Sequence, residues 1–306
     1  MKKQKGILWF IFCIVLQNMI YGFGNPLAKI GNSDMGTFWC PAARFLVASA
    51  VMLLFFGRRI LTQLRCAGWK AWLPASLCLM LNFILFNLGI MFSSVTTTAF
   101  LNSMAVFFAP IMATLFLRKK YRLVTIPIQL GAAVGLFLLC CNGNVFTFGL
   151  GETFALLSAV AAAGALVFAQ GSLDTLDSVA TSGAQIFVTA IGFTLLAIVF
   201  DDIKTVYTAG VVSWLVVLYL GIACSCVAYM LQNAALGHLS AGSVSMIQCV
   251  QPIMTAFFSY LLLREKLTPV AIAGVVVITI TVLLNSILDM RMEKKNAQAA
   301  AGPAVS

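Results

Sequence analysis

Long apolar segments alternate with short polar loops along almost the whole chain. Because about 20 apolar residues cross a bilayer as a helix, this pattern predicts ten membrane-spanning helices. The first follows a basic N-terminus but runs to about Tyr21 with no small-residue cleavage site after it, so we expect a retained span rather than a signal peptide. The predicted spans are residues 7–28, 37–57, 71–92, 97–117, 124–141, 151–170, 179–200, 210–231, 241–263 and 268–288.

Part of this pattern occurs twice. Residues 99–116 match residues 241–258 without a gap, and seven of the 18 positions are identical. The copies are the fourth and ninth predicted spans, so each half contains five spans. Five crossings invert the second half relative to the first. The sequence predicts an all-α polytopic membrane protein of two inverted five-helix repeats, residues 1–142 and 143–290, followed by a disordered cytoplasmic tail over 291–306.

The composition excludes several other classes. Hydrophobic residues make up 61% of the chain and charged residues 9%, whereas soluble domains carry about 25% charged residues. The net charge of +10 lies mainly in short loops, so it is not a nucleic-acid-binding surface. The nine cysteines show neither zinc-site nor redox spacing. We expect neither a metal nor a cofactor.

Lysine and arginine are distributed unequally between the two sides. With the N-terminus inside, fourteen lie on the inner side and four on the outer side. This bias predicts a multi-pass protein of the cytoplasmic membrane, surrounded by lipid, with both termini in the cytoplasm. Gly131 and Gly135 of the fifth span form a small-residue face that suits either packing within the chain or a homodimer.

Each half of the chain contains several short motifs in a definite order. The second half contains GLGE at 149–152, YLGIA at 219–223, YMLQNAALGHL at 229–239, the segment 241–252, and REKL at 264–267. The first half contains GNP at 24–26, RFL at 44–46 and the segment 99–110. Together they resemble the EamA-type transporters of the drug/metabolite transporter superfamily over residues 7–288. In one departure, Leu123 stands after the fourth span where Glu265 follows the ninth.

The resemblance implies a central cavity lined by spans 1–4 and 6–9, with spans five and ten at the periphery. It implies a secondary transporter that works by alternating access on small polar metabolites, most often exporting amino acids or related compounds. A multidrug or other metabolite permease of the same fold is the alternative, and a membrane scaffold or sensor without transport is an alternative of another class. The sequence lacks HExxH and any other catalytic set, so no enzyme activity is expected.

Arg44 lies within the second predicted span, where a charge is costly. It could attract a substrate carboxylate through a charge-assisted hydrogen bond, or it could bind helix-end carbonyls or a loop acid such as Asp34. Tyr21 and Tyr229 lie deep in their spans and could stack on a substrate or close a gate. No acid lies clearly in mid-membrane to carry a coupling proton, so we expect facilitated or weakly coupled transport.

The segment from Gly22 to Pro26 is predicted to break the first helix near its outer end, because Pro26 removes a backbone donor. Irregular backbone at this depth lines a cavity or is buried in protein. Gly22, Gly24 and Pro26 are therefore candidate hinge residues, and Asn25 is a candidate substrate contact. An ordinary bend at a helix end is the alternative.

Pro110 and Pro252 occupy equivalent positions in the fourth and ninth spans. Each should kink its helix, so the pair are candidate gate hinges or, alternatively, static kinks needed for packing. Several amides also lie within spans, where most polar side chains join helices to one another. Asn102, Gln248 and Gln251 are the amides we expect to contact the substrate.

Overall fold

The computed structural model describes residues 2–93, 95–118, 123–141, 149–263 and 268–300, and within these ranges it is helical, with no strand. In them, nine helical stretches are long and apolar enough to cross a membrane, and Leu123–Leu139 is a shorter tenth. The predicted all-α polytopic fold is therefore confirmed. The first half contains α1 (Lys2–Met35), α2 (Trp39–Ala67), α3 (Trp69–Phe92), α4 (Val95–Asn102), α5 (Ala105–Leu117) and α6 (Ile126–Cys141). The second contains α7 (Leu150–Ser172), α8 (Ser178–Phe200), α9 (Lys204–Thr208), α10 (Val211–Tyr219), α11 (Ala228–Leu236), α12 (Ala241–Gln248), α13 (Gln251–Leu263) and α14 (Pro269–Ala300).

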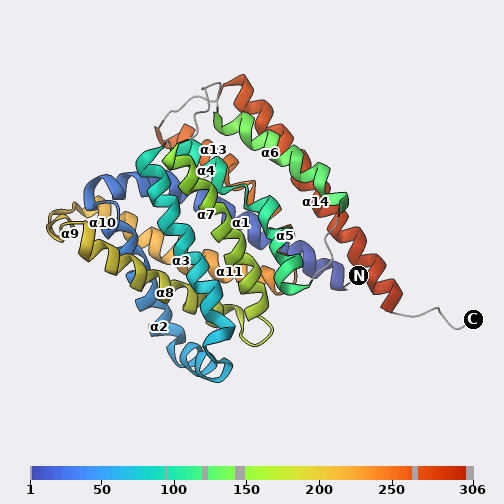
Figure 1. The fold of residues 1–306 in the computed structure, drawn as a ribbon, viewed down its shortest axis with the longest axis horizontal. Helices are drawn as coiled ribbons and strands as arrows, with labels where there is room; N and C mark the ends of the chain where they lie inside the picture. The colour runs from blue at the N-terminus through green and yellow to red at the C-terminus, as the bar shows by residue number, and fades with distance from the viewer. Residues whose placement is uncertain (1, 94, 119–122, 142–148, 264–267, 301–306) are drawn as a thin grey trace, which may run out of the picture.

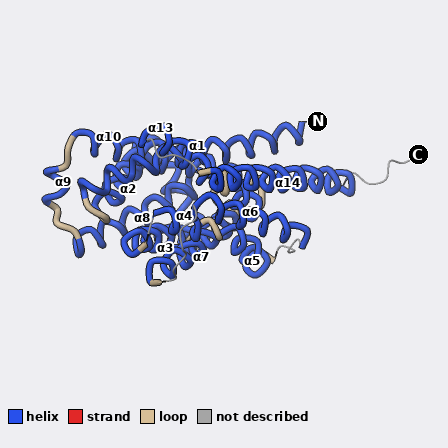
Figure 2. The backbone as a smooth tube through the Cα atoms, turned by 90° about the horizontal axis from the view of Figure 1, so that it is seen from above, coloured by secondary structure: helices blue, strands red, loops and turns tan. Residues whose placement is uncertain are grey.

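The first helix of each half packs among helices of the other half. α1 lies against α10, α11 and α13, while α7 lies against α3, α4 and α5. α2 pairs with α8, and α6 pairs with α14. Figure 1 shows α6 and α14 side by side at one edge of the bundle, as expected for the fifth and tenth spans. In Figure 2 the start of α1 and the end of α14 project on the same side of the molecule.

Small residues bring α6 and α14 together. A Cβ on Gly274 would lie 2.6 Å from the carbonyl oxygen of Gly135, and a Cβ on Gly131 would lie 2.7 Å from Cγ2 of Thr281. The backbones approach this closely because glycine has no side chain. The small-residue face predicted in the fifth span is thus used within the chain, and a homodimer stays a prediction.

Three spans change their helical geometry along their length. α4 ends at Asn102 and is separated from α5 by a turn, in which Met104 N donates to Leu101 O at 3.0 Å. α12 ends at Gln248, and the turn before α13 has a similar bond from Val250 N to Ile247 O at 3.1 Å. Between α10 and α11, residues Leu220–Val227 form a π-helical segment, here called the π segment. Such segments are frequent at functional sites.

The predicted break in the first helix is wrong, because α1 runs without interruption through Gly22 and Pro26. The glycines serve helix packing instead. A Cβ on Gly22 would lie 2.4 Å from Cβ of Met254 on α13, and a Cβ on Gly24 would lie 2.6 Å from Sγ of Cys224 in the π segment. The helix thus continues past the proline while close neighbours contact it on two sides.

The prolines of the fourth and ninth spans also differ from the prediction of two equivalent kinks. Pro252 is the second residue of α13, directly after the break, and proline suits a first helical turn because its missing N–H would have no partner there. Pro110 lies inside α5, beyond the break that precedes it. The break in the fourth span is therefore not at its proline.

The C-terminal segment is more ordered than the sequence analysis predicted. α14 continues as a helix to Ala300, so the expected disordered tail is wrong from residue 291 to that point. Apart from Asn296, residues 291–300 are all Arg, Met, Glu, Lys, Gln or Ala, which are good helix formers. Residues 301–306 lie outside the described ranges.

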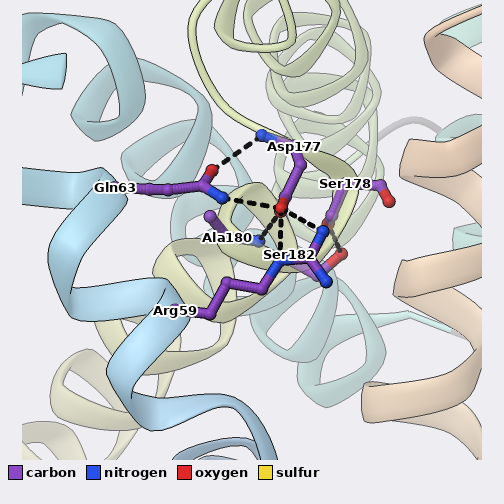
Figure 3. Close-up of polar contacts among 6 residues, drawn as sticks. All are labelled: Arg59, Gln63, Asp177, Ser178, Ala180 and Ser182. Carbon is purple, nitrogen blue, oxygen red and sulfur yellow. Dashed lines mark hydrogen bonds and ion pairs between the residues drawn. The ribbon is translucent and has the colours of Figure 1, made fainter. Parts of the chain in front are cut away.

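Asp177 joins the two halves at the end of the bundle where α2 ends and α8 begins. This end is here called the basic end, because Arg58 and Arg59 of α2 are exposed there. Asp177 is the N-cap of α8, and its Oδ1 accepts from Ala180 N at 2.8 Å. Its Oδ2 accepts from Arg59 Nε at 2.6 Å and from Gln63 Nε2 at 2.7 Å (Figure 3). Burial acts to raise the pKa of Asp177, but these hydrogen bonds outweigh it and hold the pKa below its usual value.

Two aspartates make similar connections at the opposite end. Asp201, which follows α8, accepts from the backbone N of Phe38 at 2.7 Å, at the start of α2. Asp34 of α1 accepts from Gly210 N at 2.9 Å and from Ser213 Oγ at 2.6 Å, at the start of α10. The first N–H groups of a helix have no partner within it. Each half thus supplies a cap to a helix of the other.

Candidate functional site

Arg44 lies on α2 where that helix touches the π segment. A Cβ on Gly221 would sit 2.9 Å from the carbonyl oxygen of Arg44, so the missing side chain allows this approach. Arg44 Nε donates to Ser225 Oγ at 2.8 Å. The guanidinium also lies 5.1 Å from the ring centroid of Phe45 and 5.4 Å from that of Phe83, within range of cation–π attraction.

One nitrogen of the Arg44 guanidinium remains unused. Nη2 is buried and has no hydrogen-bond partner among the residues the structure describes. Asp34, the loop acid considered as a partner, caps α10 instead. In the described ranges the one salt bridge joins Arg59 to Asp177. No acid in that part of the chain therefore balances the charge of Arg44.

Tyr21 of α1 and Tyr229 of α11 meet close to Arg44. Their ring centroids are 6.2 Å apart and the rings stand edge to face at 81°. Both side chains are near enough to Arg44 to interact with it electrostatically, as is Cys224 of the π segment. The structure thus brings three of the predicted substrate contacts together from three different helices.

A polar network surrounds the break in the fourth span. Asn102, the last residue of α4, accepts through Oδ1 from Asn82 Nδ2 at 2.8 Å and from Ser158 Oγ at 2.9 Å. Asn82 Nδ2 also donates to the carbonyl oxygen of Ser158 at 2.9 Å. These bonds connect α3 and α4 of the first half with α7 of the second.

A second network surrounds the break in the ninth span. Gln248, the last residue of α12, donates through Nε2 to Gln232 Oε1 at 2.9 Å. The same oxygen accepts from Gln17 Nε2 at 2.7 Å. These bonds connect α11 and α12 of the second half with α1 of the first.

The two networks are counterparts under the inverted repeat. In each, the last residue of a short helix, Asn102 or Gln248, bonds to an amide on the preceding span of its own half. Each network then reaches the first helix of the other half, through Ser158 on α7 or Gln17 on α1. Both breaks are therefore tied to the opposite half by neutral hydrogen bonds.

The other predicted residues lie apart from Arg44 or have simpler contacts. Asn25 is exposed and donates to Thr255 Oγ1 of α13 at 2.9 Å. Gln251 begins α13, is partly buried, and makes no side-chain hydrogen bond within the described ranges. Pro110 packs against the second residue of α12, since a Cβ on Gly242 would lie 3.1 Å from its Cγ. Glu265 lies outside the described residues.

Three further residues, which were not predicted from the sequence, take part in these contacts: Gln17, Asn18 and Ser225. Gln17 and Asn18 are consecutive amides inside an apolar span, and that pairing was a signal that could have identified them. Ser225 stands in a run of small residues, and nothing in its sequence context predicts a π segment there. Among the described residues no group of three or more His, Cys, Asp or Glu comes together to hold a metal ion.

Comparisons with known proteins agree with this architecture. A family model, the EamA-like transporter family, matches residues 7–141 and 149–287. No curated protein shows significant similarity to the chain. A crystal structure of another protein superposes with a TM-score of 0.79 at 15% identity, covering 93% of this chain and 98% of the other. At that identity the likeness shows the fold alone.

Proposed function

Since the chain belongs to the EamA-like transporter family, we propose that it is a secondary transporter of small polar metabolites that carry a carboxylate, foremost amino acids. We further propose that it exports them across the cytoplasmic membrane, with both termini in the cytoplasm. The observation that carries the substrate class is the unpaired Nη2 of Arg44.

The charge of Arg44 gives the physical reason. Taking a charge out of water without a partner is costly. Arg44 is partly buried, its Nη2 is fully buried, and the described residues supply no acid to balance its charge. A substrate carboxylate at Nη2 would add a charge-assisted hydrogen bond and neutralise the guanidinium. Ser225 and the rings of Phe45 and Phe83 would keep the guanidinium in place for it.

The alternating-access part of the proposal is supported by the two interrupted spans. Each break is a point where a helix can bend without losing a regular i→i−4 hydrogen bond. The networks at Asn102 and Gln248 tie each break to the opposite half. An exchange of these neutral bonds would let one end of the bundle open while the other closes.

The first experiment is efflux from proteoliposomes of the purified chain loaded with a labelled mixture of amino acids, with and without a pH gradient. Selective loss of one group of amino acids supports the proposal, and Arg44→Ala should slow that loss by weakening substrate binding. Retention of every amino acid alongside efflux of cationic drugs would instead support a multidrug permease. If no solute leaves vesicles that contain correctly oriented protein, the result would contradict transport and favour a membrane scaffold or sensor.

A further inference from the structure

Two neighbouring amides of α1 keep unpaired oxygens in the middle of the bundle. Gln17 is 1% exposed and Asn18 is 0% exposed. Gln17 uses Nε2 to bond Gln232, and Asn18 uses Nδ2 to bond the carbonyl oxygen of Ile247 at 2.9 Å. Gln17 Oε1 and Asn18 Oδ1 have no donor among the described residues. A buried oxygen left unpaired costs about 1–3 kcal/mol, so a ligand that meets these oxygens would stabilise the folded chain.

The orientation of Asn18 follows from its partner. A carbonyl oxygen only accepts hydrogen bonds, so the atom that meets Ile247 O must be the NH₂ group. The other terminal atom of Asn18 is therefore the oxygen. An amide oxygen can only accept a hydrogen bond or coordinate a cation, so a ligand at this position must be a hydrogen-bond donor or a cation.

Both amides reach the last turn of α12. Asn18 contacts Ile247 directly, and Gln17 meets Gln248 through their shared partner Gln232. The last carbonyls of a helix carry the negative end of its dipole. Pro252 has no N–H to offer the carbonyl of Gln248, one turn before it. Asn18 thus holds its unpaired oxygen next to the last turn of α12, and Gln17 is joined to the same turn through Gln232.

We propose that a monovalent alkali cation binds between α1 and the break after α12. Its ligands are Gln17 Oε1, Asn18 Oδ1 and backbone carbonyl oxygens of the last turn of α12. Neutral oxygens of this kind replace the hydration shell of Na⁺ or K⁺ in membrane proteins, often at the ends of broken helices. The absence of a carboxylate from this ligand set favours a single charge, because burying a divalent ion would cost far more.

The site gives the proposed transport, on which this step rests, a source of ion coupling without an intramembrane acid. Asn18 precedes Tyr21 by three residues, which is about one helical turn or roughly 5 Å along α1. Tyr21 in turn lies close to Arg44. A substrate carboxylate at Arg44 and a cation at Asn18 attract one another, so each raises the affinity for the other.

Cation binding is measured first, without any transport assay. The thermal unfolding midpoint of the purified full chain is compared in NaCl, KCl and choline chloride at one fixed ionic strength. A ligand that binds only the folded state raises this midpoint in a saturable way. We expect Na⁺ or K⁺ to do so relative to choline, with the difference between the two salts identifying the preferred ion.

Matched variants locate the site. Asn18→Leu should abolish the salt-specific rise. Thr181→Val, which removes another buried and unpaired oxygen on α8, should keep it. If Asn18→Leu does not yield folded protein, Asn18→Asp decides, because an added carboxylate should lower the cation concentration needed by about tenfold or more, or roughly 1.4 kcal/mol.

Equal midpoints in all three salts, or a rise that persists in Asn18→Leu, would overturn the cation site and leave a water molecule to fill the position. Coupling is then tested separately, by substrate uptake into proteoliposomes with and without an Na⁺ or K⁺ gradient. If the cation binds but no amino acid is transported, the cation site is supported and the proposed transport function is contradicted.

Discussion

At the residue scale, Arg44 shows what a single position in the sequence can and cannot reveal. A lone charge in an apolar run is visible in the sequence, and its cost in the membrane marks it as a candidate site. Its partner Ser225 was not predictable, because it lies 181 residues away and depends on the π segment and on the close approach at Gly221. The unpaired Nη2 is likewise a property of the packed structure.

Replacing Arg44 tests its proposed role directly. Arg44→Ala should raise the substrate concentration needed for half-maximal transport by about 10- to 100-fold, since a hydrogen bond to a charged group contributes about 1.5–3 kcal/mol. For Arg44→Lys this concentration should lie between those of the wild type and Arg44→Ala, because a single ammonium keeps the charge but cannot replace the several donors of a guanidinium. The measurement is counterflow in proteoliposomes. Arg58→Ala, an exposed arginine at the basic end, is the control and should transport normally.

Asp177 makes a pH-dependent contribution to stability. Its folded-state pKa lies below the usual value of 3.8, so its contribution is complete above about that pH and is lost as the pH falls through the folded-state pKa. Asp177→Asn keeps an N-cap oxygen but removes the charge that faces Arg59, so it should lower the unfolding midpoint at pH 7 by an amount equivalent to about 1 kcal/mol or less. The wild type and the variant should converge in strongly acidic solution. A difference independent of pH would contradict this account.

At the element scale, α1 explains why one prediction from sequence was wrong. Glycines and a proline close together are typical of a helix break, and the sequence could not show that α13 and the π segment lie against Gly22 and Gly24. The pattern that signals flexibility in isolation serves close packing here. In the ninth span the break lies directly before Pro252, whereas in the fourth span it lies several residues before Pro110.

Gly22→Ala tests this packing. Its Cβ would lie 2.4 Å from Met254 Cβ and 2.8 Å from the Met254 backbone carbon, so α1 and α13 must separate. We expect a loss of about 1–3 kcal/mol, as for other overpacked positions, seen as a lower unfolding midpoint in detergent. Gly57→Ala on α2 is the control, because its Cβ would meet Leu53 at an ordinary 3.7 Å. An unchanged midpoint for Gly22→Ala would show that the helices are not in close contact.

At the scale of the whole molecule, the number of spans, the two repeats and the edge position of the fifth and tenth spans could all be predicted. They follow from apolar segment length, internal similarity and resemblance to a family. The tyrosine pair beside Arg44 and the two amide networks could not, because each joins α1 or α7 to helices of the other half. Contacts of this kind have no local signature.

The orientation in the membrane can be tested with a native cysteine. Cys66 is exposed at the basic end, whereas the other cysteines with described side chains are buried or partly buried. If this end faces the cytoplasm, a membrane-impermeant maleimide should label Cys66 in inside-out vesicles and not in right-side-out vesicles. Cys66→Ser should remove the labelling. Labelling confined to right-side-out vesicles would reverse the proposed orientation.

The exchange of first helices between the halves has a consequence for biosynthesis. α1 enters the membrane before its partners α10, α11 and α13 have been translated. Until then its amides and glycines lack the contacts that they make in the folded protein. A chain that stops after the first repeat leaves α1 without most of its partners and leaves α3 to α5 without α7. Quality-control proteases should therefore remove each half made alone, and co-expression of both should rescue them, because each half completes the other.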